Sequence, residues 1–414
     1  MRKLGIFWAC ALMSHAVFSA PGLVDEEKIS ERVIKNFNIP IRVLLEKQAS
    51  HGAAKSHGTT LYLSPANSKW ERIGSSAKLH IEIRNGTPVL LVNDLPFSGR
   101  ALYLRGGPIA SDILSYKGKK YRGALRITLR ENRFNVVNVL PIEDYLEGML
   151  ASEMSPSWEL EALKAQAVAA RSYALYMVKH PKNTLYDLEA GTQDQVYGGV
   201  EKETARVKTA VKETAGIYLG FRHEPIKAFF HSRCGGTTET AQTVWNHPSP
   251  AHRSRVNCPF CRNSPAPWHF SVGHESFFQQ LNLPYQKSSP FSLSHSLSPS
   301  GRVSELKIQT TQGHRQVTSD ELRAILGYTK MKSAFFDWKI GKEDIFFDGK
   351  GNGHGVGMCQ WGARQFAREG KGFRDILTHY YPEATIYDRK PWPNAQPLPP
   401  ETPNATTIAR KESP

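Results

Sequence analysis

A glutamate interrupts the apolar stripe of a predicted helix in the first half of the chain. Leu146, Met149 and Leu150 follow the i, i+3, i+4 spacing of one helix face, and the next position of that stripe holds Glu153. A carboxyl group that faces apolar surroundings loses hydration, so its pKa rises and it keeps a proton near neutral pH, as a general acid requires. Two other placements stay open: Glu153 can swing out to solvent at the helix end, or pair with Arg171.

A second set of residues has the spacing of metal ligands. His231-x-x-Cys234 and Cys258-x-x-Cys261 together offer one imidazole and three thiolates, a set that suits a structural, tetrahedral zinc. The surrounding residues, 245–300, are rich in loops, where a metal can replace missing apolar core. A Cys258–Cys261 disulfide and free thiols are the alternatives, and the spacing leaves all three states open.

A block of alternating glycines, residues 349–357, contains His354 and is followed by Gln360. The block has neither the G-x-G-x-x-G spacing nor the Gly-Lys-Ser/Thr ending of nucleotide-binding loops, so we expect no organic cofactor. Alternating glycines allow close approach by a sugar ring or by another backbone. The alternative is a tightly packed structural turn.

The elements that must position these groups indicate an α+β fold with a β-rich N-terminal part. Residues 41–139 contain short β-type runs divided by turns, and residues 142–180 change to helical period with a turn at 155–157. We therefore expect a helix–turn–helix catalytic segment inserted in one elaborated domain. The expected divisions are a signal peptide (1–19), a strand-rich region (20–135), a catalytic region (136–388) and a disordered, Pro-rich tail (389–414).

Composition and charge narrow the class of protein. The 414 residues are 40% hydrophobic and 22% charged, a globular mixture that excludes a largely disordered chain. No apolar run approaches the roughly 18–20 residues of a membrane-spanning helix, so no transmembrane segment is expected after signal removal. The 53 Lys+Arg against 38 Asp+Glu give a net charge of +15, which favours an acidic partner.

The N-terminus predicts export. Arg2 and Lys3 precede a short apolar stretch and a small-residue exit near Ser19, the parts of a secretory signal peptide; the alternative is a buried N-terminal helix. Export would place the protein in the periplasm or elsewhere in the cell envelope. That location argues against nucleic acid as the partner of the positive charge.

Several ordered blocks resemble the SpoIID family, the stage II sporulation protein D and LytB amidase-enhancer group of cell-wall proteins. They are 138–154 with 161–173, then 195–199, 230–236 and 353–363. The resemblance runs from roughly residue 121 to residue 381. Zinc is known in this family through a different His/Cys run, and residues 180–200 of this chain contain no cysteine, so that site is not carried over.

The resemblance implies a lytic transglycosylase that cuts peptide-stripped peptidoglycan strands, with Glu153 in the position of the catalytic glutamate. One carboxyl would protonate the MurNAc–GlcNAc oxygen and then deprotonate the C6 hydroxyl of the same MurNAc, which leaves a 1,6-anhydro end. Lactyl carboxylates make such strands polyanions, in keeping with the net charge of +15. The candidate substrate contacts are Arg171, Tyr197, His231, Ser232, His354 and Gln360.

The main rival is a protein of another class, a non-catalytic peptidoglycan-binding module that stimulates an N-acetylmuramoyl-L-alanine amidase. The glutamate at position 153 favours the enzyme. The cellular process, whether division, sporulation or general wall remodelling, stays open.

Overall fold

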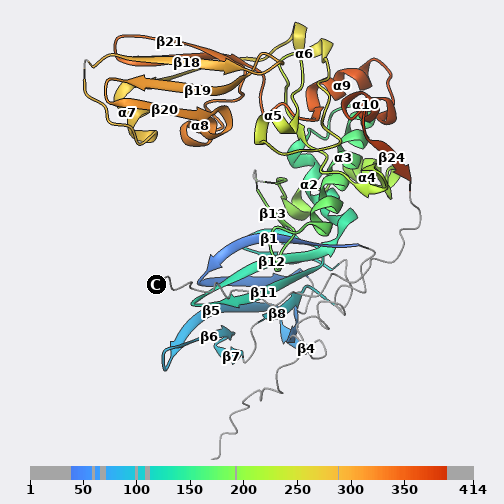
Figure 1. The fold of residues 1–414 in the computed structure, drawn as a ribbon. Coiled ribbons are helices and arrows are strands. Elements are labelled where there is room, and N and C mark those ends of the chain that lie inside the picture. Colours follow the sequence, from blue (N-terminus) through green and yellow to red (C-terminus); the bar gives the residue numbers. More distant parts are fainter. Residues whose placement is uncertain are drawn as a thin grey trace, which may run out of the picture.

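The computed structural model describes residues 39–388, apart from 58–60, 66–70, 98–100, 108–111, 192–193 and 288. The predicted signal peptide and the Pro-rich tail lie outside the described residues. The predicted α+β class, with a β-rich N-terminal part, is confirmed. Figure 1 shows the strands of that part at the bottom, a helical centre above them, and a second group of strands that extends sideways at the upper left.

Two sheets form the β-rich N-terminal part. The first has the order β13 (Leu188–Glu189), β1 (Pro40–Ala49), β12 (Arg133–Pro141), β11 (Ala124–Arg130), β8 (Ala101–Arg105), β3 (Leu61–Pro65) and β4 (Glu71–Gly74). The second has the order β10 (Lys119–Tyr121), β9 (Leu114–Tyr116), β2 (His51–Ser56), β5 (Ser76–Arg84), β6 (Thr87–Val92) and β7 (Leu95–Phe97). Strand β12 pairs antiparallel with β1 and β11 and is buried along most of its length, as expected for an inner strand.

Strand β12 leads directly into the predicted helix–turn–helix. Helix α2 (Ile142–Glu153) starts after Pro141 with Glu143 and Asp144 in its first turn, where acidic groups favour the positive end of the helix dipole. Helix α3 (Leu160–Lys179) follows and is buried on nearly every side. Its alanines let other elements approach closely, and α2, α4, α9, α10 and β14 all contact it.

The remaining elements of the helical centre come from distant parts of the chain (Figure 1). They are η1 (Gly199–Lys202), α4 (Ala205–Glu213), β14 (Ile217–Phe221), β15 (Glu224–Pro225), β16 (Phe230–His231), α5 (Ala241–Trp245), α6 (Pro259–Asn263), β23 (Met358–Cys359), α9 (Gln360–Arg368), α10 (Phe373–Tyr380) and β24 (Thr385–Asp388). Strand β16 pairs in parallel with β23, and β14 pairs antiparallel with β24. These two pairings bring the C-terminal segments back to α3.

The sideways group consists of two three-stranded sheets and two helices. Its elements are β17 (Pro267–Gly273), α7 (His274–Gln280), β18 (Phe291–Leu297), β19 (Val303–Thr310), β20 (Gly313–Thr318), α8 (Ser319–Leu326), β21 (Phe336–Ile340) and β22 (Asp344–Lys350). Buried Phe277, Leu306 and Phe347 belong to an apolar core of its own. None of the helices in the described ranges is long and apolar enough to cross a membrane.

Candidate active site

The carboxylate of Glu153 lies at the C-terminal end of α2. Leu146, Met149 and Leu150 of the same stripe are fully buried, whereas Glu153 itself is half-buried. The backbone N–H of Val196 donates a hydrogen bond to its Oε1, at 2.9 Å. Glu153 is therefore partly withdrawn from solvent and is held by a backbone donor, and among the described residues Arg171 pairs with Glu143 instead of with it.

Burial is the main influence on the acidity of this group. Loss of hydration raises the pKa of Glu153 from its usual 4.5, and hydrogen bonds from Val196 and the side chain of Gln360 partly oppose the rise. Its pKa is shifted by no other carboxylate of the described residues. The arrangement gives a carboxyl that is easier to protonate than a free glutamate, with two hydrogen-bond donors that stabilise its ionised form.

The loop that carries Val196 is held by a neighbouring buried residue. Tyr145, on the inner face of α2, donates its hydroxyl to Oε1 of Gln195 at 2.8 Å. The side-chain amide of Gln195 donates in turn to the carbonyl of Ala170 on α3. Both contacts are buried, so α2 and α3 together set the position of the N–H that faces Glu153.

Gln360 reaches the carboxylate from the far end of the chain. It is the first residue of α9, is 6% exposed, and donates to Oε1 of Gln166 on α3 at 3.5 Å as well as to Glu153. Gln360 therefore lies beside the carboxyl group of Glu153, and its predicted contact with substrate stays a prediction.

Two tryptophans flank this group, and the sequence pattern did not indicate them. Trp158, in the turn after Glu153, and Trp361, next to Gln360, meet edge to face with ring centroids 4.9 Å apart. The guanidinium of Arg233 lies 3.9 Å from the centroid of Trp361. The available signal in the sequence was that Trp361 directly follows Gln360 and that Trp158 lies five residues after Glu153.

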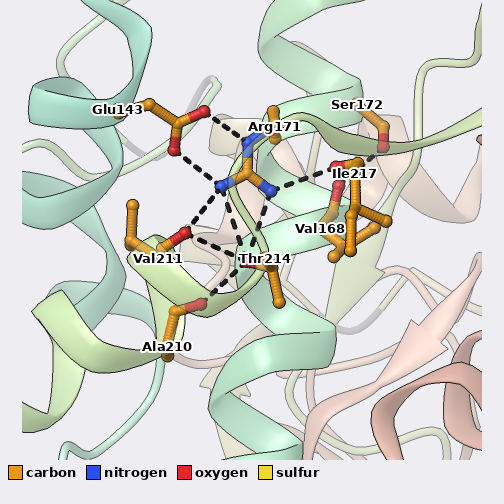
Figure 2. Close-up of polar contacts among 8 residues, drawn as sticks. All are labelled: Glu143, Val168, Arg171, Ser172, Ala210, Val211, Thr214 and Ile217. Carbon is orange, nitrogen blue, oxygen red and sulfur yellow. Dashed lines mark hydrogen bonds and ion pairs between the residues drawn. The ribbon is translucent and has the colours of Figure 1, made fainter. Parts of the chain in front are cut away.

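Arg171 does not lie where a substrate can reach it. Its side chain is fully buried on α3 and forms a two-pronged ion pair with Glu143 of α2, with N–O distances of 2.9 and 2.7 Å (Figure 2). It also donates to the carbonyl oxygens of Ile217 and Val211. The predicted substrate contact is corrected: Arg171 joins α2, α3, the end of α4 and β14.

Tyr197 also has a packing position. It is 4% exposed, donates its hydroxyl to Oδ1 of Asn138 at 2.9 Å, and packs against Tyr145. A Cβ atom on Gly148 would come within 2.8 Å of its ring, so the glycine lets α2 approach this loop. Tyr197 therefore supports the helix that bears Glu153 and presents no surface to a ligand.

Three further predicted contacts lie close to the parallel pair of β16 and β23: His231 ends β16, Ser232 follows it, and His354 lies in the glycine block before β23. His231 is buried and hydrogen-bonds the carbonyl of Val356 through Nδ1, while burial lowers its pKa to about 3. Both ring nitrogens of His354 are used by the backbone, Nε2 with Phe230 O and Nδ1 with Val356 N. Ser232 is half-buried, and within the described residues its hydroxyl has no hydrogen-bond partner. Of the three, Ser232 alone has a side-chain group available to a ligand.

Four cysteines meet beside these strands. The Sγ atoms of Cys234, Cys258, Cys261 and Cys359 all lie within 4.8 Å of one another, and all four residues are buried and unoxidised. The predicted metal set is thus corrected in one member: Cys359 stands in the group, and His231 does not. The chemistry of four thiols at this separation suits a thiophilic cation.

The comparisons with known proteins agree with the geometry. A family model described as stage II sporulation protein, SpoIID, matches residues 130–221, which include α2, α3 and the Val196 loop. The stage II sporulation protein D of Bacillus subtilis (strain 168) is 33% identical over 265 residues, 59% of this chain and 74% of that protein. The chain belongs to the SpoIID family.

Other relatives extend the match beyond that segment. An uncharacterized protein of Brachyspira hyodysenteriae is 36% identical over 280 residues, 67% of this SpoIID-family chain and 75% of that protein. The amidase enhancer of Bacillus subtilis is 27% identical over 417 residues, 83% of this chain and 57% of that protein. A model of a domain of unknown function matches residues 290–357, most of the sideways group and the glycine block.

Proposed function

We propose that this SpoIID-family chain is a lytic transglycosylase of the cell envelope that cuts MurNAc–GlcNAc bonds in peptide-stripped peptidoglycan strands. The observation that carries the proposal is the isolated, half-buried carboxyl of Glu153, whose pKa burial raises. The names of its relatives, stage II sporulation protein D and amidase enhancer, support a role in cell-wall processes.

The reaction needs one carboxyl group that works twice. Protonated Glu153 donates its proton to the glycosidic oxygen as the C1–O bond of MurNAc breaks. The carboxylate, stabilised by the donors on Val196 and Gln360, then takes the proton of the C6 hydroxyl as that oxygen bonds to C1. The products are a 1,6-anhydro-MurNAc end and a free GlcNAc hydroxyl, and Glu153 is protonated again.

Among the described residues, no second carboxylate influences the pKa of Glu153, and this argues against hydrolysis. Glycoside hydrolases generally use a second Asp or Glu to activate water or to form an intermediate. The acidic side chain next along the Val196 loop, Asp194, is fully buried and already bound by Tyr173 and Lys182. It has no capacity left for such a role.

A second candidate function has its own observation. The amidase enhancer aligns with a larger share of this chain, 83%, than the sporulation protein, 59%. On that reading the chain would bind peptidoglycan and stimulate a cell-wall amidase, and Glu153 would have no chemical role.

One experiment separates the two. Purified wild type and Glu153→Gln are incubated with peptide-free glycan strands, and the products are read by mass spectrometry. We expect anhydro-MurNAc ends from wild type, none from Glu153→Gln, and equal glycan binding by both. The control is Glu201→Gln, which removes an exposed carboxylate on η1 and should cleave normally. Stimulation of an amidase by both proteins without any cleavage would support the enhancer instead.

A further inference from the structure

The four-cysteine cluster is assembled from three separate segments. Cys234 follows β16, Cys258 and Cys261 lie on one turn at the start of α6, and Cys359 ends β23. The parallel pairing of His231 with Cys359 places the last thiol beside the first segment. A backbone hydrogen bond from Cys258 N–H to the carbonyl of Gly236, 2.9 Å, joins the first segment to the second.

We infer that Cys234, Cys258, Cys261 and Cys359 bind one zinc ion, and that this ion holds Gln360 against Glu153. In a tetrahedral zinc tetrathiolate, Zn–S bonds of about 2.3 Å separate the sulfurs by about 3.8 Å. The cluster has a Cys261–Cys359 separation of 3.4 Å and no separation above 4.8 Å. The four thiols therefore reach zinc geometry through small side-chain movements.

Hydrogen-bond donors already surround the sulfurs. The N–H of Gly236 lies 3.4 Å from Sγ of Cys234, and the hydroxyl of Tyr380 lies 3.3 Å from Sγ of Cys258. Such contacts orient thiolate ligands and stabilise their negative charge. Cysteines that served only as apolar core residues would not require hydrogen-bond donors at their sulfur atoms.

A buried cation beside the cluster supplies a further argument. Arg302 is 3% exposed and donates to the carbonyl oxygen of Cys234 at 2.5 Å. Arg302 forms no ion pair of its own in the described part of the chain, and the buried carboxylate of Glu239, which favours its charge, is already paired with Arg255. A buried guanidinium that shares its counter-charge in this way is costly. Zinc with four thiolates carries a net charge of −2, so the metal site would add negative charge beside this guanidinium.

The metal would act on the site through chain connectivity. Cys359 is followed directly by Gln360, which donates to Glu153 and to Gln166. Fixing Cys359 therefore fixes the first turn of α9. This link to cleavage rests on the proposed function, whereas zinc binding itself does not.

The packing of α9 shows how closely it approaches the cluster. A Cβ atom on Gly362 would lie 2.6 Å from Sγ of Cys258 and 1.9 Å from the hydroxyl of Tyr380. Only glycine at position 362 therefore allows α9 to lie this close to Cys258 and Tyr380. A shift of the first turn of α9 would therefore disturb Cys258, which couples the position of Gln360 to the thiol cluster.

The test begins with metal analysis of the full-length protein purified without added metal. We expect one zinc per chain, loss of that zinc in Cys359→Ser, and its retention in His231→Asn, which keeps a nitrogen donor toward Val356. Replacement of zinc by cobalt should give thiolate-to-cobalt charge-transfer absorption, which weakens or disappears in Cys359→Ser. Zinc retained by Cys359→Ser, or no zinc together with a mapped Cys258–Cys261 disulfide, would overturn the site.

A second measurement covers the case in which Cys359→Ser does not fold. Titration of wild-type thiols with a mercurial should release one zinc for the four cysteines, and alkylation should be slow until a chelator is added. Rapid alkylation of all four thiols, with no metal released, would refute the inference.

The effect on Gln360 is measured without reference to activity. Removal of zinc by a chelator should increase amide hydrogen exchange in residues 230–236, 256–263 and 358–363, and leave the strands at 124–141 unchanged. Unchanged amide hydrogen exchange in residues 358–363 after zinc removal would refute the proposed link between the metal site and Gln360. Zinc with full coupling but no glycan cleavage by wild type would instead refute the proposed function and leave the metal site standing.

Discussion

Glu143 and Arg171 join the two helices of the candidate active site through a two-pronged ion pair whose cation is fully buried. The pair lies on the opposite end of α2 from Glu153. It ties the first turn of α2 to α3, the helix against which α2 packs.

Loss of the ion pair should destabilise the fold. Glu143→Gln leaves the guanidinium of Arg171 buried without its counter-charge, which typically costs about 3–5 kcal/mol, and the partial exposure of Glu143 favours the lower end. The free energy of unfolding in urea measures the effect. The control is Glu224→Gln in the exposed pair with Lys179, where about 0–1 kcal/mol is expected. Equal effects of the two changes would show that burial of Arg171 contributes nothing.

The stability of wild type relative to Glu153→Gln should depend on pH. Burial raises the pKa of Glu153 above 4.5, so the folded chain binds this proton more tightly than the unfolded chain. The carboxyl therefore favours folding below pH 4.5, and this contribution is lost as the pH rises through the folded-state pKa. Glu153→Gln does not titrate and should gain stability relative to wild type over that interval. Urea unfolding at steps from about pH 4 to about pH 8 measures the difference, which should not stay constant.

Cleavage should fall on the alkaline side as Glu153 loses its proton. Gln360 lowers the pKa of the carboxyl by donating a hydrogen bond, so Gln360→Leu should move this fall to higher pH and reduce the rate. The pH dependence of kcat/KM on peptide-free glycan strands measures the shift. Gln365→Leu, on an outer face of α9 where Gln365 contacts Glu369, is the control and should leave the profile in place. Identical pH profiles for wild type, Gln360→Leu and Gln365→Leu would show that Gln360 does not influence the pKa of Glu153.

Helix α2 should tolerate no side chain at position 148. Gly148→Ala favours the helix by about 1 kcal/mol through propensity, but its Cβ would lie 2.8 Å from the ring of Tyr197. Overpacking of this kind costs about 1–3 kcal/mol, so a net loss of stability is expected in urea unfolding. Gly191→Ala, where a Cβ meets nothing within 4 Å, is the matched control. A stabilised Gly148→Ala would show that the ring of Tyr197 moves away freely.

Local periodicity was enough to predict the element and position of Glu153. The stripe of Leu146, Met149 and Leu150 lies within two helical turns, so its orientation depends on neighbouring residues alone. The α+β class and the helix–turn–helix follow from the same kind of pattern. The helix boundaries at 142 and 179 agree closely with the predicted segment of 142–180.

Long-range pairs explain what the pattern could not show. Arg171 was predicted to bind substrate alongside the family resemblance, and nothing local marks its guanidinium as buried. Its partner Glu143 lies 28 residues away on another helix, so the pattern could not reveal the ion pair. Cys359 was left out of the metal set because it lies 98 residues from Cys261 and has no second ligand at a short spacing. Only the parallel pairing of β16 with β23 brings it into the group.

The span of these contacts has a consequence for how the chain matures. Gln360 and Gln166 meet across 194 residues, so the order of synthesis places Glu153 on its helix long before its partner amide exists. Loop closure over such separations is slow compared with the formation of a helix. A nascent chain that has not reached Cys359 and Gln360 therefore holds an acid without its partner donor. Under the proposed function, full wall-cutting activity would require synthesis to have passed residue 360, more than 200 residues after Glu153.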